Sequence, residues 1–377
     1  MAQLVTQITG EPMRNVCDAA PQLTDMRPYD PKYLPAHAFL SANENPRDVD
    51  QEIRREITSA VKRVSLNRYP DPLANDLRDM IAEANGLDRD QVLVGNGGDE
   101  LLFNLALAWG GPGRTFLNLP PTFSVYENNA RLTNTTVVNI PRMVDYRIDE
   151  EAVLERVAQG GIDYLIVTSP NNPTGELANE SFIVKLLEAT DALVMVDEAY
   201  FEFSRSTTRP YLQQHKNLVI LRTFSKAFSL AGVRMGYILG DPDVIREFVK
   251  VRQPYSVDAI SQAVAQVVFA HRASFEPGIR TIIEERARIV DGLKRIPGVK
   301  SYPSDANYVL LRVQNAATIW EMLYTRGILV RDFSRAPYLE DCLRISVGTP
   351  EENNSFLHAL RDAVMGKCDL PTRSDNA

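Results

Sequence analysis

The sequence predicts an α/β fold, in which a mostly parallel sheet lies between helices and is followed by a smaller α+β domain. Short runs rich in Val, Ile and Leu alternate with helical patterns over the first two thirds of the chain, an order typical of parallel sheets. Beyond about residue 270 a long charged helix interrupts this alternation. The strands expected in the main sheet are Gln91–Val94, Phe116–Leu119, Thr136–Ile140, Tyr164–Thr168, Leu193–Val196 and Leu218–Leu221.

The change of pattern divides the chain into three predicted parts. Residues 1–48 form an N-terminal arm and part of the small domain, residues 49–270 the large domain, and residues 271–377 the C-terminal small domain. An arm that precedes a domain usually needs a surface to lie on, which in an oligomer is often a neighbouring subunit. The elements expected in the small domain are helices near Ser274–Arg295, Ala317–Arg326 and Glu351–Val364 and strands at Tyr308–Val313, Ile328–Val330 and Cys342–Val347.

Composition and charge exclude several classes of function. The 377 residues are 44% apolar and 24% charged, with a net charge of −8 spread along the chain. This balance predicts neither a nucleic-acid face nor a membrane patch. No apolar run approaches the roughly twenty residues that span a bilayer, and the first thirty residues lack the apolar core of a signal peptide. We therefore expect a cytoplasmic protein with no nucleic-acid or membrane partner.

The cysteines and histidines do not predict a metal site or a disulfide framework. The three cysteines and four histidines are widely scattered and lack the close spacing of metal ligands. An odd, unpaired set of cysteines is typical of a reducing compartment. These residues are Cys17, Cys342 and Cys368, and His37, His215, His271 and His358.

Lys226 is the residue around which the functional prediction is built. It follows the strand Leu218–Leu221, and loops at strand ends are where open α/β sheets bind ligands. A lysine amine condenses with a carbonyl compound to a Schiff base when its surroundings disfavour the ammonium form. Arg222 and Arg234 lie nearby in the sequence, and like charges favour the neutral amine. Lys226 is therefore a candidate covalent anchor, although most lysines are solvated surface charges.

A glycine-rich segment is a candidate phosphate cradle. Gly95–Gly98 follows the strand Gln91–Val94 and is expected to be a flexible loop, with Asp99 opening a helix. Glycines let the backbone approach a ligand closely, and the free N–H groups at a helix start bind anions. The segment matches neither the Walker loop nor the Gly-x-Gly-x-x-Gly fingerprint, and a lone glycine-rich turn is weak evidence for phosphate binding.

Three further motifs follow strands of the predicted sheet. Asn172 and Asp197 come directly after two neighbouring strands, and Tyr200 lies three residues beyond Asp197. A carboxylate at a strand end can pair with a protonated ring nitrogen, whereas Asn172 and Tyr200 can hydrogen-bond a phenolate oxygen. Phe123 falls past a strand end, where its ring can stack on a planar ligand. The occurrence of these motifs in this order, each after its own strand, favours one shared site.

These residues resemble the class I and II aminotransferases, which are fold type I pyridoxal phosphate enzymes. The similarity runs from about Tyr29 to Val364, and the branch that acts on histidinol phosphate is most similar. It implies a large domain with a mostly parallel seven-stranded sheet, a smaller α+β domain, and a homodimer with shared active sites. The motifs are Asn-Arg-Tyr-Pro, Gly-Asn-Gly-Gly-Asp-Glu, Asn-Asn-Pro-Thr-Gly, Asp-Glu-Ala-Tyr, Ser-Lys-Ala-Phe and Leu-Arg-Ile-Ser-Val-Gly.

The resemblance implies a role for each candidate residue toward pyridoxal 5'-phosphate. Lys226 carries the cofactor and moves a proton during the reaction, and Asp197 keeps the pyridine nitrogen protonated. Tyr200 and Asn172 bind the ring oxygen, and Phe123 stacks on the ring. The residues implied to hold the phosphate are Gly98, Asp99, Thr223, Ser225 and Arg234, together with Tyr69 of the other subunit.

Substrate choice depends on three residues outside this group. Arg344 and Arg331 match positions that the family uses for substrate anions, and Tyr29 matches an arm tyrosine that reaches the substrate phosphate. Because a guanidinium binds carboxylate and phosphate alike, one pocket can accept glutamate and a phosphate ester. The implied reaction exchanges the amino group between glutamate and imidazole acetol phosphate in histidine biosynthesis. Phe123 departs from the tyrosine of many relatives, and two alternatives stay open: an aromatic amino acid aminotransferase and a threonine-phosphate decarboxylase.

Overall fold

The computed structural model describes residues 19–24, 26, 30, 32 and 34–366. The chain divides into two units, residues 1–31 and 32–377. In the first unit the described residues form a short 3-10 helix, Pro21–Leu23. The two sheets described below belong to the second unit.

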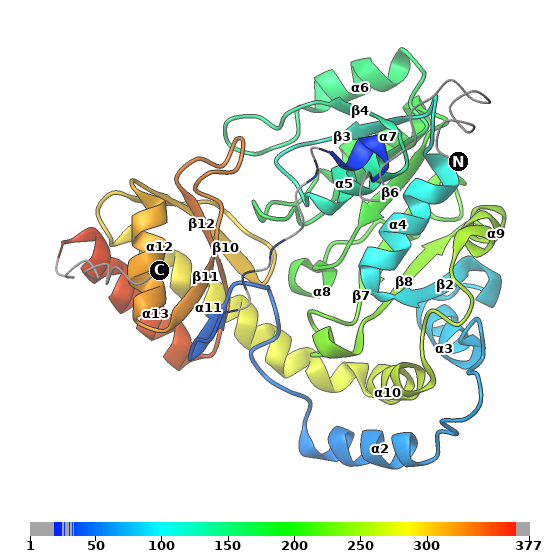
Figure 1. Ribbon diagram of the computed structural model, residues 1–377, viewed down its shortest axis with the longest axis horizontal. Coiled ribbons are helices and arrows are strands. Elements are labelled where there is room, and N and C mark those ends of the chain that lie inside the picture. The colour runs from blue at the N-terminus through cyan, green and yellow to red at the C-terminus, as the bar shows by residue number, and fades with distance from the viewer. Residues whose placement is uncertain (1–18, 25, 27–29, 31, 33, 367–377) are drawn as a thin grey trace, which may run out of the picture. The chain divides into compact units, whose positions relative to one another are not determined.

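A seven-stranded sheet organises most of the second unit (Figure 1). Its strand order is β2-β8-β7-β6-β5-β3-β4. The strands from β7 to β4 run parallel, whereas β8 is antiparallel to both β2 and β7. This confirms the predicted fold class. The strands are β2 Val92–Asn96, β3 Thr115–Asn118, β4 Thr136–Asn139, β5 Tyr164–Thr168, β6 Leu193–Asp197, β7 Leu218–Thr223 and β8 Met235–Gly240.

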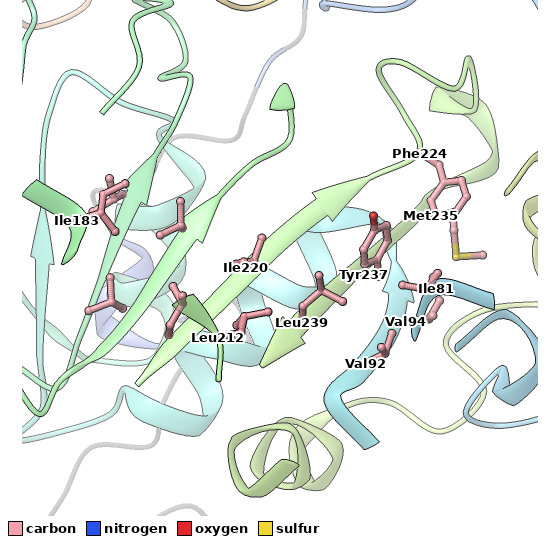
Figure 2. Close-up of a cluster of buried hydrophobic side chains, with 14 of the residues drawn as sticks. Ile81, Val92, Val94, Ile183, Leu212, Ile220, Phe224, Met235, Tyr237 and Leu239 are labelled. Carbon is pink, nitrogen blue, oxygen red and sulfur yellow. The ribbon is translucent and has the colours of Figure 1, made fainter. Parts of the chain in front are cut away.

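Helices cover both faces of this sheet, so its central strands are buried throughout. Successive side chains of a strand point to opposite faces, and they divide between two apolar cores. Ile220 belongs to the core shown in Figure 2, beneath α2, α3, α6, α7 and α10, while Val219 faces α4, α5 and α9. These helices are α2 Gln51–Lys62, α3 Asn75–Asn85, α4 Gly97–Trp109, α5 Val125–Leu132, α6 Glu150–Ala158, α7 Glu180–Ala189, α9 Pro242–Val251 and α10 Ala259–Ala270.

Strand β8 is the one strand of this sheet that the apolar pattern did not indicate. Glycines at both ends shorten its apolar run to three residues. Gly236 is required by close packing, because a Cβ there would lie 2.8 Å from the backbone nitrogen of Gly98. The missing side chain therefore allows β8 to lie against the start of α4.

The start of α4 differs from the sequence prediction. We expected a flexible loop through Gly98 and a helix from Asp99, whereas β2 continues to Asn96 and the helix begins at Gly97. The positive φ of Gly97, +77°, allows the abrupt strand-to-helix turn. The backbone N–H groups of Gly98 and Asp99 consequently belong to the first turn of a thirteen-residue helix.

A second, five-stranded sheet has the order β1-β11-β12-β10-β9. Strand β1, from the N-terminal region, pairs in parallel with β11, which lies more than 280 residues later in the sequence (Figure 1). This smaller mixed sheet agrees with the predicted α+β part, although β1 and β9 were not predicted, and the exact domain limits stay a prediction. The elements are β1 Ala38–Leu40, β9 Val299–Ser301, β10 Tyr308–Val313, β11 Ile328–Asp332, β12 Cys342–Ser346, α11 Glu276–Lys294, α12 Ala316–Thr325 and α13 Pro350–Val364.

The described residues contain neither a membrane-spanning helix nor a cluster of metal ligands. No helix among them is long and apolar enough to cross a membrane. No cluster of three or more His, Cys, Asp or Glu side chains within the same residues has the arrangement of a metal site.

Candidate active site

Three neighbouring parallel strands end in polar residues at one edge of the seven-stranded sheet. Thr168 of β5 is the register partner of Asp197 of β6, and Asp197 is the register partner of Leu221 of β7. The loop that carries Lys226 begins after Thr223, where β7 ends. The structure therefore brings the strand-end motifs to the same edge, where open α/β sheets bind their ligands.

Asp197 is a buried carboxylate with its own hydrogen-bond donors. Tyr126 of α5 donates its hydroxyl to Asp197 Oδ2 at 2.6 Å, and the backbone N–H of Ala199 donates to Oδ1 at 3.0 Å. Thr168 Oγ1 donates in turn to the Tyr126 hydroxyl at 2.9 Å. Burial raises the pKa of Asp197 to about 6, and the Tyr126 hydrogen bond acts in the opposite direction. The side chain is thus fixed, and its charged form would gain from a cationic partner.

Lys226 has an environment that favours a neutral amine. Its Nζ lies 3.0 Å from the carbonyl oxygen of Ala42, to which it donates. Burial is the main cause that lowers the pKa of Lys226 to about 8, and the positive charges of Arg344 and Arg234 contribute. At this pKa an appreciable share of the amine is unprotonated at neutral pH, as a Schiff-base lysine requires.

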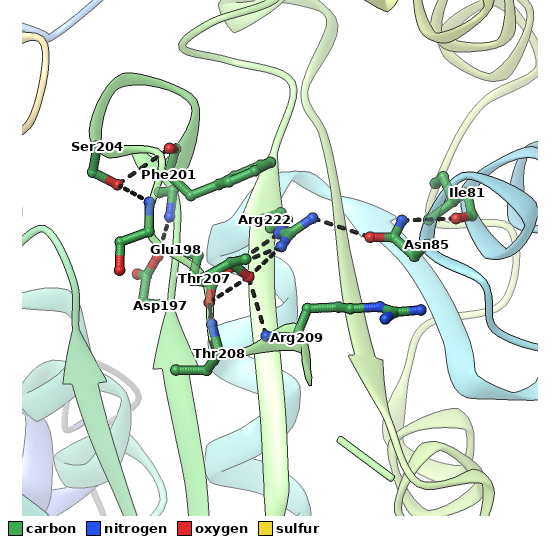
Figure 3. A network of polar contacts seen from close by, with 12 residues as sticks. Ile81, Asn85, Asp197, Glu198, Phe201, Ser204, Thr207, Thr208, Arg209 and Arg222 are labelled. Atoms are coloured by element: carbon green, nitrogen blue, oxygen red, sulfur yellow. Dashed lines mark hydrogen bonds and ion pairs between the residues drawn. The ribbon is translucent and has the colours of Figure 1, made fainter. Parts of the chain in front are cut away.

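The prediction that Arg222 helps to keep the Lys226 amine neutral is wrong, because Arg222 points elsewhere. Side chains alternate along β7, so Arg222 points to the opposite face of the sheet from Thr223. There its guanidinium donates to Glu198 Oε2 through Nε at 3.0 Å and Nη2 at 2.9 Å. Figure 3 shows this buried pair together with Thr207 and Asn85, which also accept hydrogen bonds from Arg222. The second cation near Lys226 is Arg344, from the other sheet.

The predicted phosphate residues gather around the start of α4. Arg234 Nη2 lies 3.0 Å from Asp99 Oδ2, and its Nη1 lies 3.4 Å from Ser225 Oγ. Thr223 Oγ1 donates to Ser225 Oγ at 3.0 Å. Gly98 is the second residue of the helix, where the backbone N–H has no partner within the helix.

This arrangement fits a phosphate group. Hydroxyls, a guanidinium and the N-terminus of a long helix are the donors that bind phosphate in proteins. A Cβ on Gly97 would lie 2.6 Å from Arg234 Nη2, so the glycine leaves room for the guanidinium at the helix start. The residues present therefore match the phosphate of the implied cofactor.

Arg331 and Arg344 are directly opposite each other on the antiparallel strands β11 and β12. Directly opposite residues point to the same face of a sheet. The ring of Phe333 lies 5.9 Å from the guanidinium carbon of Arg331 and 5.6 Å from that of Arg344. Arg344 is buried and donates to Asn172 Oδ1 at 2.5 Å. Two cations on one face predict an anion site, and the Asn172 contact links it to the strand ends of the other sheet.

A loop after β1 contacts three of the candidate residues in succession. The carbonyl of Ser41 accepts from Arg344 Nη2 at 2.6 Å, and the carbonyl of Ala42 accepts from Lys226. Asn43 Nδ2 donates to the hydroxyl of Tyr200 at 3.0 Å. No role was predicted for these residues from the sequence.

Two of the remaining candidates, Phe123 and Tyr69, make contacts with other aromatic rings. Phe123 packs its ring against Tyr126 in an edge contact, with centroids 5.6 Å apart. Tyr69 is 81% exposed, and its ring stacks on Tyr255 at 4.4 Å. Tyr29 lies outside the described residues.

Comparison with known proteins identifies the family. A family model described as aminotransferase class I and II matches residues 39–360. The chain belongs to the class I and II aminotransferases. Histidinol-phosphate aminotransferase from Chlorobium phaeobacteroides is 38% identical over 344 residues, covering 90% of this chain and 95% of the relative. Histidinol-phosphate aminotransferase 1 from Carboxydothermus hydrogenoformans is 39% identical over 340 residues, covering 90% and 96%.

Solved structures share the fold. Histidinol-phosphate aminotransferase from Sinorhizobium meliloti, in complex with pyridoxal-5'-phosphate, matches with a TM-score of 0.85 at 24% identity and covers 94% of this chain and 99% of its own. L-threonine-O-3-phosphate decarboxylase from Porphyromonas gingivalis matches with a TM-score of 0.75 at 27% identity and covers 86% and 98%. The aminotransferase fold therefore does not by itself separate transamination from decarboxylation.

Two side chains that were not predicted contact the candidate residues. Tyr126 lies three residues after Phe123, but only the fold shows that its hydroxyl reaches Asp197. Asn43 left no signal, because its partner Tyr200 is 157 residues away. Both form hydrogen bonds with residues that the motifs had already indicated.

We predict that the amine of Lys226 titrates near pH 8. Because only the neutral amine attacks an aldehyde, pyridoxal phosphate should bind the apoprotein covalently at a rate that rises about tenfold per pH unit below pH 8 and then levels. Stopped-flow absorbance measures this rate. Lys216, whose side chain is 78% exposed, supplies the control variant Lys216→Ala, which should not change the profile. A rate that still rises tenfold between pH 9 and 10 would contradict the lowered pKa.

Proposed function

We propose that this protein transfers an amino group between glutamate and imidazole acetol phosphate, giving 2-oxoglutarate and histidinol phosphate. The observation that carries the substrate is the identity of 38 and 39% to histidinol-phosphate aminotransferases along nearly the whole chain. The pair of arginines on β11 and β12 supports it, because both substrates bring an anionic group to the site. A cytoplasmic location belongs to the same proposal.

Pyridoxal 5'-phosphate, when bound, supplies an electron sink that stabilises negative charge at the substrate α-carbon. Lys226 would anchor it and then carry a proton to and from that carbon as a neutral amine. Asp197 would hold the pyridine nitrogen in its protonated form, and Tyr126 keeps this carboxylate in place. The residues proposed to complete the site are Tyr200 and Asn172 at the ring oxygen, Phe123 on the ring, and Gly98, Asp99, Thr223, Ser225 and Arg234 at the phosphate.

Arg344 and Arg331 would bind the anionic ends of the substrates. The contacts of Arg344 with Asn172 and Ser41 fix its guanidinium before a substrate arrives, which lowers the entropic cost of binding. Tyr29 would contribute from the arm of a second subunit. Glutamate and the phosphate ester would use this site in alternate halves of a ping-pong cycle.

A homodimer is part of the proposal. Tyr69 is proposed to reach the phosphate site of the second subunit, and this residue is 81% exposed in the single chain. Other large apolar residues are also exposed, namely Leu66, at 80%, Tyr255 and Ile260. The exposed rings of Tyr69 and Tyr255 stack on each other, and exposed apolar groups that adjoin one another are typical of surfaces that a partner covers. Sedimentation of the purified protein tests the dimer.

Two assays test the proposed activity: the reaction of the holoenzyme with glutamate alone, and a comparison of histidinol phosphate with phenylalanine as amino donors. Glutamate alone should convert the bound cofactor to its pyridoxamine form, as seen in its absorbance, whereas a threonine-phosphate decarboxylase would leave the spectrum unchanged. Histidinol phosphate should then be a better amino donor than phenylalanine by kcat/KM. A preference for phenylalanine would favour the aromatic aminotransferase instead.

We predict that the two arginines differ in which substrates they serve. Arg344→Lys removes bidentate binding of both substrates, so the KM values of glutamate and histidinol phosphate should each rise about 10–100-fold. Arg331→Lys should raise the KM of histidinol phosphate more than that of glutamate. Steady-state kinetics with each substrate measures these effects, and Arg335→Lys, on an exposed neighbouring loop, is the matched control. Unchanged KM values in both variants would contradict the assigned anion site.

A further inference from the structure

Asn43 is a buried residue whose polar groups all have partners. Its side chain is 1% exposed, and its backbone adopts the left-handed conformation with φ of 55°. Nδ2 donates to Tyr200 and Oδ1 accepts from Ser346 Oγ at 3.1 Å. Its backbone N–H donates to the same Oγ at 2.8 Å, and its carbonyl accepts from Asn307 Nδ2 at 2.9 Å. With Nδ2 on the Tyr200 hydroxyl and Oδ1 on Ser346 Oγ, the amide is held in one orientation.

The orientation of the amide decides the direction of the hydrogen bond to Tyr200. An amide NH₂ group donates and does not accept, whereas a phenol has one hydrogen to donate. The Tyr200 oxygen therefore accepts from Asn43, and its own hydrogen must point away from Asn43. An aspartate or a carbonyl in place of this NH₂ group would reverse that direction.

Asn43 also connects Tyr200 to the anion site. Ser346 and Arg344 are two residues apart on β12, and the residues before Asn43 contact Arg344 and Lys226 through their carbonyl groups. The short segment 41–43 thus touches the proposed anion-binding, anchoring and ring-oxygen residues in order. The Asn43 side chain holds this segment against both Ser346 of β12 and Tyr200.

We propose that Asn43 is a positioning residue that directs the Tyr200 hydroxyl toward the ring oxygen of bound pyridoxal phosphate. The inference rests on the proposed function and deepens it. A hydroxyl that donates to this oxygen stabilises its negative charge and so lowers the pH at which the bound cofactor takes up a proton. Without the Asn43 amide, the Tyr200 hydrogen loses its fixed direction and this stabilisation weakens.

The test is the pH midpoint of the cofactor absorbance in the holoenzyme, with no substrate present. Asn43→Gly removes the amide and retains the left-handed backbone, because glycine adopts positive φ freely. We expect its midpoint to rise by about 0.5–1 pH unit, the change that corresponds to one hydrogen bond. Tyr200→Phe should raise the midpoint as well, and the double variant should match Tyr200→Phe alone. Additive shifts, or no shift in Asn43→Gly, would overturn the role of Asn43.

Two further variants separate positioning from general damage. Asn315→Gly is the matched control, because Asn315 is an exposed asparagine with φ of 58°, and its midpoint should equal that of the unmodified protein. Ser346→Ala removes the partner of Asn43 Oδ1 without changing the backbone, and it decides the matter if Asn43→Gly does not fold. We expect a smaller rise that disappears in the Tyr200→Phe background, and an unchanged midpoint would refute the proposal.

The outcome also distinguishes this inference from the proposed function. A protein that shows no cofactor absorbance band after incubation with pyridoxal phosphate would contradict the proposed function. A normal band whose midpoint is the same in all variants would contradict only the role of Asn43.

Discussion

Lys226→Ala is expected to fold normally and to lose transamination by at least about 10⁴-fold in kcat, because it removes both the anchor and the proton carrier. Lys226 lies on a loop, and although its amine is shielded from water, the residue as a whole is partly exposed, so alanine leaves no large cavity. Removing a charge that burial disfavours should not destabilise the apoprotein. Circular dichroism checks the fold, and a coupled glutamate assay checks the rate.

The informative comparison is with an exposed lysine. Lys216→Ala changes the same residue type at a side chain that is 78% exposed and should retain full activity. Lys226→Ala should also fail to retain pyridoxal phosphate after borohydride treatment, since no amine remains to be reduced onto it. A normal transamination rate in Lys226→Ala would refute the anchor assignment and with it the proposed mechanism.

The sequence was sufficient to predict that the strand-end motifs share one edge of the sheet. Each candidate motif follows a β-branched run, and the carboxyl ends of parallel strands must meet at one edge. The sequence therefore predicts that Asp197 and Lys226 lie near each other. Local sequence is enough for this prediction, because the position of each motif depends only on the strand that precedes it.

Contacts between distant parts of the chain were not predictable in this way. Arg222 was expected near Lys226 because the two are close in sequence, but the alternation along β7 directs Arg222 to Glu198. The cation that approaches Lys226 instead is Arg344, which comes from the other sheet. Nothing in a local pattern specifies such a pairing, since it depends on how two sheets are joined.

Strand β8 was not predicted for a different reason, which is the glycines in its sequence. Gly236 interrupts an apolar run, yet it lies within β8, and only glycine fits there because a side chain would collide with Gly98. The same contact holds the start of α4 against the sheet and places the proposed phosphate site. A residue that weakens a strand in isolation can thus be required by the packing around it.

Asp197→Asn is expected to change activity and stability in opposite directions. Asparagine cannot hold the pyridine nitrogen in its protonated form, so kcat should fall by at least about 10²-fold, as for other losses of a preorganised charge. Because the folded pKa of about 6 exceeds the ordinary value of 3.8, bound protons stabilise the apoprotein fully below pH 4, and this contribution is lost as the pH rises through 6. At pH 8 the buried carboxylate is charged, and its cost is at most about 3 kcal/mol.

Asparagine avoids that cost, so the apo variant should melt at a higher temperature than the unmodified apoprotein at pH 8 and at nearly the same temperature at pH 4. Scanning calorimetry of the two apoproteins measures the difference. Asp191→Asn, at an exposed position, should change neither quantity. A variant that is less stable at pH 8 would show that the Tyr126 and Ala199 hydrogen bonds outweigh burial of the charge. The expected result would instead mean that Asp197 is retained at a cost to the apoprotein, which a protonated ring nitrogen would offset only in the holoenzyme.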